Sequence, residues 1–96
     1  MSDTTQFELI SPERIILSCS AEMIVVPGTA GYFGVLPRHI PIISTLSAGM
    51  IDVHKHGSVV KRIFITGGLV EVTPKRCTVL TEGDISFNDN NSVNLD

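Results

Sequence analysis

Turn-forming residues recur about every eight to twelve positions along this chain, and the segments between them are short and rich in Val and Ile. Pairs such as Pro12-Glu13, Gly67-Gly68 and Pro74-Lys75 end successive apolar runs. No window of helical length combines a 3.6-residue apolar period with plausible caps. Because β-branched residues favour strands, this spacing predicts an all-β protein, either a flattened sandwich or a barrel.

Several of the expected strands alternate between apolar and polar positions. Ile63 and Ile65 share one face of their strand and Phe64 lies on the other, and Val70 and Val72 share a face in the next strand. The expected strands cover 6–11, 14–21, 22–28, 41–55 (two strands hinged at Ala48-Gly49), 58–66, 69–73, 76–82 and a last edge strand after Ile85.

The length of 96 residues predicts one domain with one core, and we place it at 1–86, followed by a polar, disordered tail at 87–96.

The formal net charge is −3, and the basic pairs Lys61-Arg62 and Lys75-Arg76 are isolated, which argues against nucleic-acid binding. No apolar run reaches the length of a membrane span, and the first residues lack the layout of a signal peptide. These features indicate a cytosolic protein that can dock on something membrane-bound.

Cys19 and Cys77 are too few and too far apart for a metal knuckle or a redox pair. Their neighbours are typical of strands, so we interpret both as small buried hydrophobic residues in a reducing compartment. A disulfide between them remains the alternative.

The segment from Pro27 to Pro41, PGTAGYFGVLPRHIP, contains three glycines and three prolines, which predicts a loop of defined shape around the buried side chains of Tyr32, Phe33, Val35 and Leu36. The spacing of its glycines, G-x-x-G-x-x-G, raises the possibility of a phosphate site. The Lys and hydroxyl of a Walker loop are missing, however, and no helix follows to receive a phosphate. An irregular strand with tight turns is the better interpretation.

The histidines were considered as metal ligands and as a catalytic base. His54 and His56 would lie on one face of a strand, but no third ligand accompanies them, so an exposed hairpin end is the better interpretation. His39 has no positioned nucleophile or carboxylate nearby in the sequence, which favours a loop-stabilising or partner-contacting role. The acidic residues are scattered, and we expect neither catalysis nor a cofactor or metal.

In sequence order, the chain contains ISPE at 10–13, PGTAGYFGVLPRHIPII at 27–43, SAGMIDV at 47–53 and IFITGGLVEVTPKRCTVLTE at 63–82. With this series it resembles the epsilon subunit of F-type ATP synthases, in the N-terminal β-sandwich domain, over nearly all of 7–84. The resemblance implies a flattened sandwich of about ten strands. It also implies a non-catalytic rotor component of the central stalk, located peripherally on the cytoplasmic face of the bacterial inner membrane.

The partners that the resemblance implies are the gamma subunit, the membrane c-ring and, through the stalk, the catalytic head, so that proton flow is coupled to ATP synthesis. Tyr32 stands where family members often carry an acidic residue, so we expect it to make a hydrogen-bonding or stacking contact instead. The implied gamma contacts are Ser11, His39 and Ser44, and the implied c-ring contacts are Gly28, Thr29, Ala30, Gly31 and Tyr32.

Family members commonly continue into a pair of C-terminal helices that inhibit hydrolysis and in some cases bind ATP. The pattern of these helices is absent here, either because the protein lacks the arm or because the sequence is truncated, and we expect this chain to bind no nucleotide. A different class of function is a free-standing β-sandwich that binds a peptide or glycan through the segment 27–41.

Overall fold

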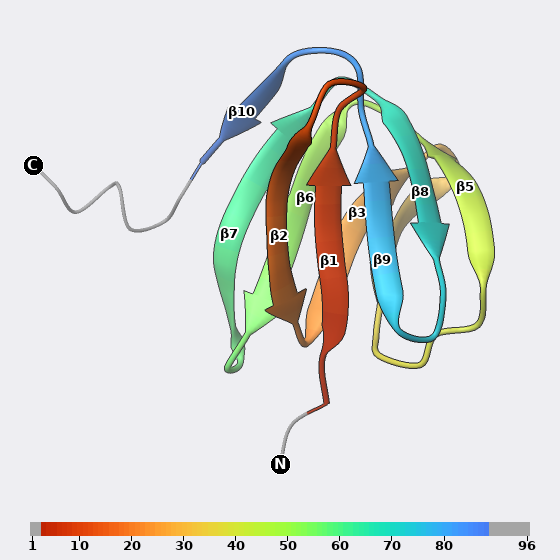
Figure 1. Cartoon of the computed structure of the whole chain (residues 1–96), viewed down its shortest axis with the longest axis vertical. Helices are drawn as coiled ribbons and strands as arrows, with labels where there is room; N and C mark the ends of the chain where they lie inside the picture. Colours follow the sequence, from red (N-terminus) through yellow and green to blue (C-terminus); the bar gives the residue numbers. More distant parts are fainter. Residues whose placement is uncertain (1–2, 89–96) are drawn as a thin grey trace, which may run out of the picture.

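A computed structural model of the chain describes residues 3–88, which form ten strands and no helix. The all-β prediction is therefore confirmed, as is the number of strands expected from the resemblance. The strands are β1 (Thr5–Ile10), β2 (Ile15–Ala21), β3 (Met23–Gly28), β4 (Gly31–Val35), β5 (Ile42–Leu46), β6 (Gly49–Lys55), β7 (Ser58–Ile65), β8 (Gly68–Val72), β9 (Arg76–Leu80) and β10 (Ile85–Phe87) (Figure 1).

The strands form one strongly curled sheet whose two halves enclose the core. Along the sheet their order is β10-β7-β6-β3-β5-β8-β9-β1-β2, and β4 pairs with β3 outside this path. The halves are joined at β3, which pairs with β6 through residues 23–25 and with β5 at Gly28. Beyond residue 25, β3 and β6 therefore diverge, and one half of the sheet separates from the other.

The core is built by alternation along the strands. Ile63 and Ile65 are buried while Phe64 between them is exposed, and Val70 and Val72 are buried together, which confirms both predicted alternations. Each large aliphatic side chain removed from water in this way stabilises the fold by about 1.5–3 kcal/mol. Other members of the core are Phe7, Leu9, Ala21, Ile24, Val26, Val35, Leu46, Ile51, Val53, Cys77 and Val79.

The connections between strands gather at two ends of the molecule (Figure 1). We call the end that carries the β1–β2, β3–β4, β5–β6, β7–β8 and β9–β10 connections the hairpin end. The opposite end carries the β2–β3, β4–β5, β6–β7 and β8–β9 connections, together with the start of β1. Because strands rise about 3.3 Å per residue, the six residues of β1 separate these ends by roughly 20 Å.

Cys19 and Cys77 are both free thiols, and the sheet keeps them apart. Phe7 on β1 pairs with Cys19 of β2 on one side and with Cys77 of β9 on the other. Two strand spacings amount to about 10 Å, whereas a disulfide requires Cα atoms closer than about 7 Å. The alternative of a disulfide between these cysteines is therefore wrong for this fold.

The segment from Pro27 to Pro41 is more regular than the loop predicted from its glycines and prolines. Its first residues complete β3 and residues 31–35 form β4, so only the two-residue turn at 29–30 and the loop 36–41 lie outside strands. The burial expected for two side chains was also wrong, because Tyr32 is 59% exposed and Leu36 is 54% exposed. Backbone pairing between β3 and β4 takes precedence over local loop preferences, and it turns Tyr32 outward.

Strand β10 ends at Phe87, one residue beyond the predicted domain boundary at 86. The remainder of the predicted tail, from residue 89 onward, lies outside the described residues.

Candidate docking surfaces

The β3–β4 hairpin contains all five residues for which a c-ring contact was predicted. Pro27 pairs with Tyr32 and Gly28 pairs with Gly31, which leaves Thr29 and Ala30 as the two exposed residues of the turn. Gly31 has a φ of 134°, a conformation that L side chains rarely adopt, so a glycine is required where β4 begins. The structure therefore brings these five residues together at the hairpin end.

Hydrogen bonds to the β5–β6 segment hold this hairpin in place. Ser47 donates its backbone N–H to the carbonyl of Pro27 at 2.8 Å, and Thr29 donates its own to the carbonyl of Thr45 at 3.2 Å. The Oγ1 atoms of Thr29 and Thr45 lie 3.1 Å apart and share a further hydrogen bond. A turn with this many anchors presents a surface of fixed shape.

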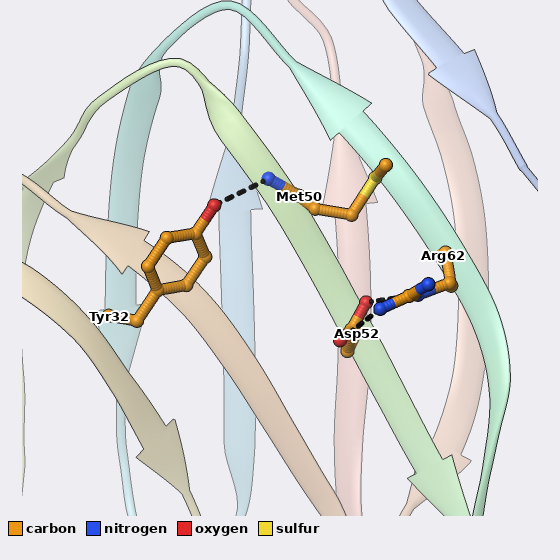
Figure 2. A network of polar contacts seen from close by, with 4 residues as sticks. All are labelled: Tyr32, Met50, Asp52 and Arg62. Atoms are coloured by element: carbon orange, nitrogen blue, oxygen red, sulfur yellow. Dashed lines mark hydrogen bonds and ion pairs between the residues drawn. The ribbon is translucent and has the colours of Figure 1, made fainter.

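Tyr32 makes an additional contact between the hairpin and β6. Its hydroxyl accepts a hydrogen bond from the backbone N–H of Met50 at 3.1 Å, as Figure 2 shows. A Cβ at Gly49 would lie 2.5 Å from that hydroxyl and 2.8 Å from the Cβ of Pro27, so glycine lets the ring approach. The hydroxyl of Tyr32 is therefore engaged within the chain, and its expected contact with the c-ring stays a prediction.

On the same half of the sheet, Asp52 of β6 and Arg62 of β7 are directly paired (Figure 2). Arg62 Nε donates to Oδ1 at 3.0 Å, and Nη2 donates to Oδ2 at 3.3 Å. This hydrogen-bonded carboxylate raises the pKa of the Arg62 guanidinium above its ordinary value. The pair is a polar surface feature rather than a free charge available to a ligand.

The other half of the sheet exposes apolar side chains on its outer surface. Thr45 of β5 pairs with Leu69 of β8, and Leu69 pairs with Leu80 of β9. Ile10 of β1 continues this row by pairing with Leu80 and with Ile15 of β2. The aliphatic face, as we call it, comprises Ile15, Ile43, Leu69 and Leu80 together with Leu36 and Ile40 of the adjoining β4–β5 loop.

Within residues 3–88, six of the ten exposed large hydrophobic residues belong to this face, and the most exposed are Ile40 at 71% and Ile43 at 68%. The β4–β5 loop is held beside it, because Arg38 donates its backbone N–H to the carbonyl of Pro74 at 2.9 Å. Within the face, Arg76 and Glu8 form an ion pair at 3.5 Å. An apolar surface with interspersed polar groups is typical of a protein–protein contact.

The three residues for which a gamma contact was predicted do not converge on one point. Ser11 lies at the hairpin end, where its Oγ accepts hydrogen bonds from the backbone N–H groups of Glu13 and Arg14, each at 3.3 Å. His39 lies at the opposite end. Ser44 alternates with Ile43 on β5, and its partner Val70 is buried, so Ser44 faces the inner side of the sheet. Their contact with gamma stays a prediction.

The side chain of His39 is hydrogen-bonded within its own loop. Its Nδ1 lies 2.7 Å from the carbonyl oxygen of Ile40, and because a carbonyl only accepts, Nδ1 carries the proton of this hydrogen bond. The preceding residue, Arg38, has a φ of 65° and pairs with Asp3 at 2.7 Å. These contacts stabilise the β4–β5 loop, which agrees with the loop-stabilising role predicted for His39.

His54 and His56 do not share a strand face, as the alternative of a metal site would have required. Strand β6 ends at Lys55, and His56 turns into the β6–β7 connection with a φ of 56°. His56 is exposed, as expected for a hairpin end, whereas His54 is half-buried. Residues 3–88 contain no group of three or more His, Cys, Asp or Glu side chains that could hold a metal ion.

Sequence reasoning missed the aliphatic face, although a signal was present. Leu69 alternates with Val70, whose side chain is buried, so the same rule that placed Val70 inside also placed Leu69 outside. The neighbouring exposed residues come from strands far apart in the sequence, and only their pairing shows that they form one surface.

Between residues 3 and 88, the structure contains no helix that is long and apolar enough to cross a membrane. Fold and surfaces together define a β-sandwich domain with a rigid hairpin at one end and an aliphatic face on one side. The family model for the ATP synthase delta/epsilon chain, beta-sandwich domain, matches residues 4–86. The chain belongs to this family, which confirms the resemblance seen in the sequence.

Similar proteins agree with this assignment. The ATP synthase epsilon chain of Rhodospirillum rubrum is 54% identical over 82 residues, which cover 85% of this chain and 61% of that protein. The ATP synthase epsilon chain of Parvibaculum lavamentivorans is 41% identical over 96 residues, covering 100% of this chain and 73% of that protein. The chain thus spans about three-fifths of the length of the Rhodospirillum rubrum relative.

Solved structures confirm the fold. A chain in the Euglena gracilis mitochondrial ATP synthase (OSCP/F1/c-ring) superposes with a TM-score of 0.79 at 20% identity, covering 94% of this chain and 59% of that chain. A chain in the Tetrahymena thermophila mitochondrial ATP synthase (central stalk/c-ring) gives a TM-score of 0.68 at 16% identity, covering 99% of this chain and 73% of that chain.

Proposed function

We propose that this chain is a non-catalytic central-stalk subunit of a proton-translocating F-type ATP synthase, in which it couples proton flow to ATP synthesis. Membership of the delta/epsilon family and the epsilon-chain relatives support this role. The observation that carries the proposal is the aliphatic face, because isolated soluble domains rarely leave so many large apolar side chains together in water.

The gamma subunit is the partner that we assign to the aliphatic face around Ile43, which leaves the Leu69–Leu80 edge at the hairpin end to the c-ring. Ile43 is 68% exposed and sits directly beside Glu71 on the neighbouring strand, so a partner would find an apolar anchor next to a polar group. Interfaces of this kind take most of their affinity from a few buried apolar anchors and use the polar rim for register. Ser11 and His39 mark the two ends of this surface.

The c-ring is the partner that we assign to the hairpin end. Thr29 and Ala30 are exposed at the tip, and the anchors to Thr45 and Ser47 keep the tip from deforming under load. A subunit that transmits torque needs such stiffness, because a flexible contact would absorb displacement. The catalytic head would then be reached through the stalk.

The bacterial relatives support a peripheral location on the cytoplasmic face of the inner membrane. In this location the chain needs no membrane span of its own, since the ring supplies the attachment.

Two serine variants test the assignment of the aliphatic face. We expect Ile43→Ser to weaken binding to the purified gamma subunit of the same cell by about tenfold, as loss of one interface anchor does. Val60→Ser is the control, because Val60 is also exposed, at 39%, but belongs to β7 in the other half of the sheet.

Both variants should retain the wild-type thermal stability, since neither side chain is in the core. Equal gamma affinity for the two variants would contradict the assignment. Recovery of the wild-type chain as a free monomer, with neither gamma nor c-ring bound, would instead favour a free-standing peptide- or glycan-binding module.

A further inference from the structure

Charged side chains are distributed unevenly between the two ends of the sandwich. Among residues 3–88, counting the loops and the strand residues next to them, the hairpin end has three acids and one base, a net charge of −2. The opposite end has two acids and four bases, a net charge of +2. The residues counted are Glu13, Arg14, Glu82 and Asp84 at the hairpin end, and Asp3, Glu22, Arg38, Lys55, Lys75 and Arg76 at the other.

The hairpin end also contains a cavity of about 330 Å³ beside the aliphatic face. Leu69 and Leu80, directly paired across β8 and β9, form an apolar wall, and Glu82 lies on the rim. Both leucines remain partly exposed, at 38% and 36%, so the wall is open to a partner. The remaining lining residues are Thr66, Gly67, Gly68 and Gly83.

Close backbone contacts fix the shape of this cavity. A Cβ at Gly68 would overlap the carbonyl oxygen of Leu80, and a Cβ at Gly83 would overlap the hydroxyl of Thr66. The buried hydroxyl of Thr81 donates to the carbonyl of Gly67 at 2.8 Å and ties the two loops together. The cavity is therefore preformed rather than induced.

The chemistry of the cavity suits a long cationic side chain. Glu82 has no hydrogen bond or ion pair within residues 3–88. An arginine can lay its aliphatic stem along Leu69 and Leu80 while its guanidinium reaches the carboxylate. An apolar side chain would leave the carboxylate covered without a partner, and an acidic one would be repelled by the negative end.

The cavity is continuous with the hairpin surface. Gly28 of the hairpin pairs with Leu46 of β5, and Leu46 pairs with Gly68, which lines the cavity. Thr29 at the tip likewise bonds Thr45, whose partner is Leu69. A protein that sits on the tip can therefore reach the cavity across a single strand.

We infer that the Leu69–Leu80–Glu82 cavity receives an arginine side chain from the partner that docks on the β3–β4 hairpin. The identity of that partner, the c-ring, rests on the proposed function. The interaction is electrostatic at an exposed rim, so it weakens as salt is added.

Binding of the full chain to detergent-solubilised c-ring from the same cell tests the inference at low and high salt. We expect Glu82→Gln to weaken binding about tenfold at low salt and much less at high salt, and Glu82→Lys to abolish it. Glu22→Gln is the matched control at the opposite end and should bind within twofold of wild type. Thermal melts verify that each variant is folded.

A second measurement probes the cavity without any partner. In a ¹⁵N NMR titration, N-acetyl-arginine amide should shift the amide signals of Gly67, Gly68 and Gly83, and the neutral isostere N-acetyl-citrulline amide should not. Glu82→Gln should remove the shifts.

The two measurements separate the two proposals. If wild type binds the c-ring and Glu82→Gln binds it equally well at low salt, the arginine site is wrong while the proposed function stands. If wild type binds neither c-ring nor gamma, the proposed function is wrong, and the titration alone decides whether the cavity binds an arginine side chain. Amide shifts caused by the arginine compound and not by the citrulline compound support the arginine site, and their absence overturns it.

Discussion

The hydroxyl of Tyr32 accepts the backbone N–H of Met50 at the point where β3 and β6 separate. The ladder between these strands ends at Val25 and Asp52, so the N–H of Met50 lies beyond it. Tyr32, which is paired with buried Pro27 on β3, supplies the acceptor for this N–H group through its hydroxyl. The side chain of Tyr32 thus links the β3–β4 hairpin to β6, beyond the point where β3 and β6 separate.

Removal of this hydroxyl should lower stability without changing the fold. We expect Tyr32→Phe to reduce the free energy of unfolding by about 1 kcal/mol, because the N–H of Met50 loses its acceptor. The corresponding shift in Tm is about 4–8 °C for a domain of this size. Ser86→Ala, which removes an exposed hydroxyl from β10, is the control and should melt with wild type in a calorimetric scan.

Two variants of Tyr32 distinguish a role in positioning the β3–β4 hairpin from direct contact with the c-ring. Tyr32→Ala removes both the hydrogen bond and the aromatic ring, and we expect it to weaken attachment of the head to the membrane sector. If Tyr32→Phe weakens co-purification as much as Tyr32→Ala, the hydroxyl acts by fixing the hairpin. Unchanged co-purification of both variants would mean that Tyr32 contributes nothing to docking.

Gly68 should tolerate no side chain. A Cβ there would meet the backbone of Leu80 rather than a flexible side chain, and the φ of 157° disfavours other residues as well. We expect Gly68→Ala to cost about 3 kcal/mol in urea unfolding. Gly57→Ala is the comparison: its φ is 78° but nothing lies within 4 Å, so it should cost only about 1 kcal/mol of backbone strain. Equal costs would contradict the steric explanation.

The buried thiol of Cys77 predicts a dependence of stability on alkaline pH. Burial raises the pKa of Cys77 from 9.0 to about 12. The folded chain then keeps a proton that the unfolded chain releases above pH 9, so stability is full below that pH and is lost as pH rises toward 12. The loss is about 1.4 kcal/mol per pH unit in this window.

Comparison with Cys77→Ala isolates this contribution, because every other ionisable group is common to both proteins. The stability advantage of wild type over the variant should shrink between pH 9 and 11 in denaturant titrations. An advantage that does not change with pH would refute the linkage.

The two thiols should also differ in reactivity. Burial raises the pKa of Cys19 despite the nearby charges of Lys61 and Lys55, but this thiol is only half-buried, whereas Cys77 is fully enclosed. We expect iodoacetamide at pH 8 to modify Cys19 slowly and Cys77 only after unfolding, because the thiolate is the reactive form. Mass spectrometry of the two peptides measures both rates; modification of native Cys77 at the rate of Cys19 would contradict the burial.

Local patterns were sufficient to predict most strands. The alternation around Ile63 and Val70 identified core positions correctly, because a strand has a period of two wherever it pairs. The same reasoning failed for Tyr32, whose glycine-rich surroundings indicated a buried loop. For the histidines it was right in part: His56 lies at an exposed hairpin end as predicted, because a turn with positive φ follows the end of β6, whereas His54 is half-buried.

By itself, the sequence determined the all-β class, the positions of the turns and the family, since each of these depends on residues close together in the chain. Tertiary structure decided which exposed residues meet. Ile15 and Leu80 share a surface, and Gly28 is joined to Gly68 through Leu46, because strands far apart in sequence pair in the curled sheet. The aliphatic face and the cavity beside Glu82 exist only through that pairing, which no local pattern encodes.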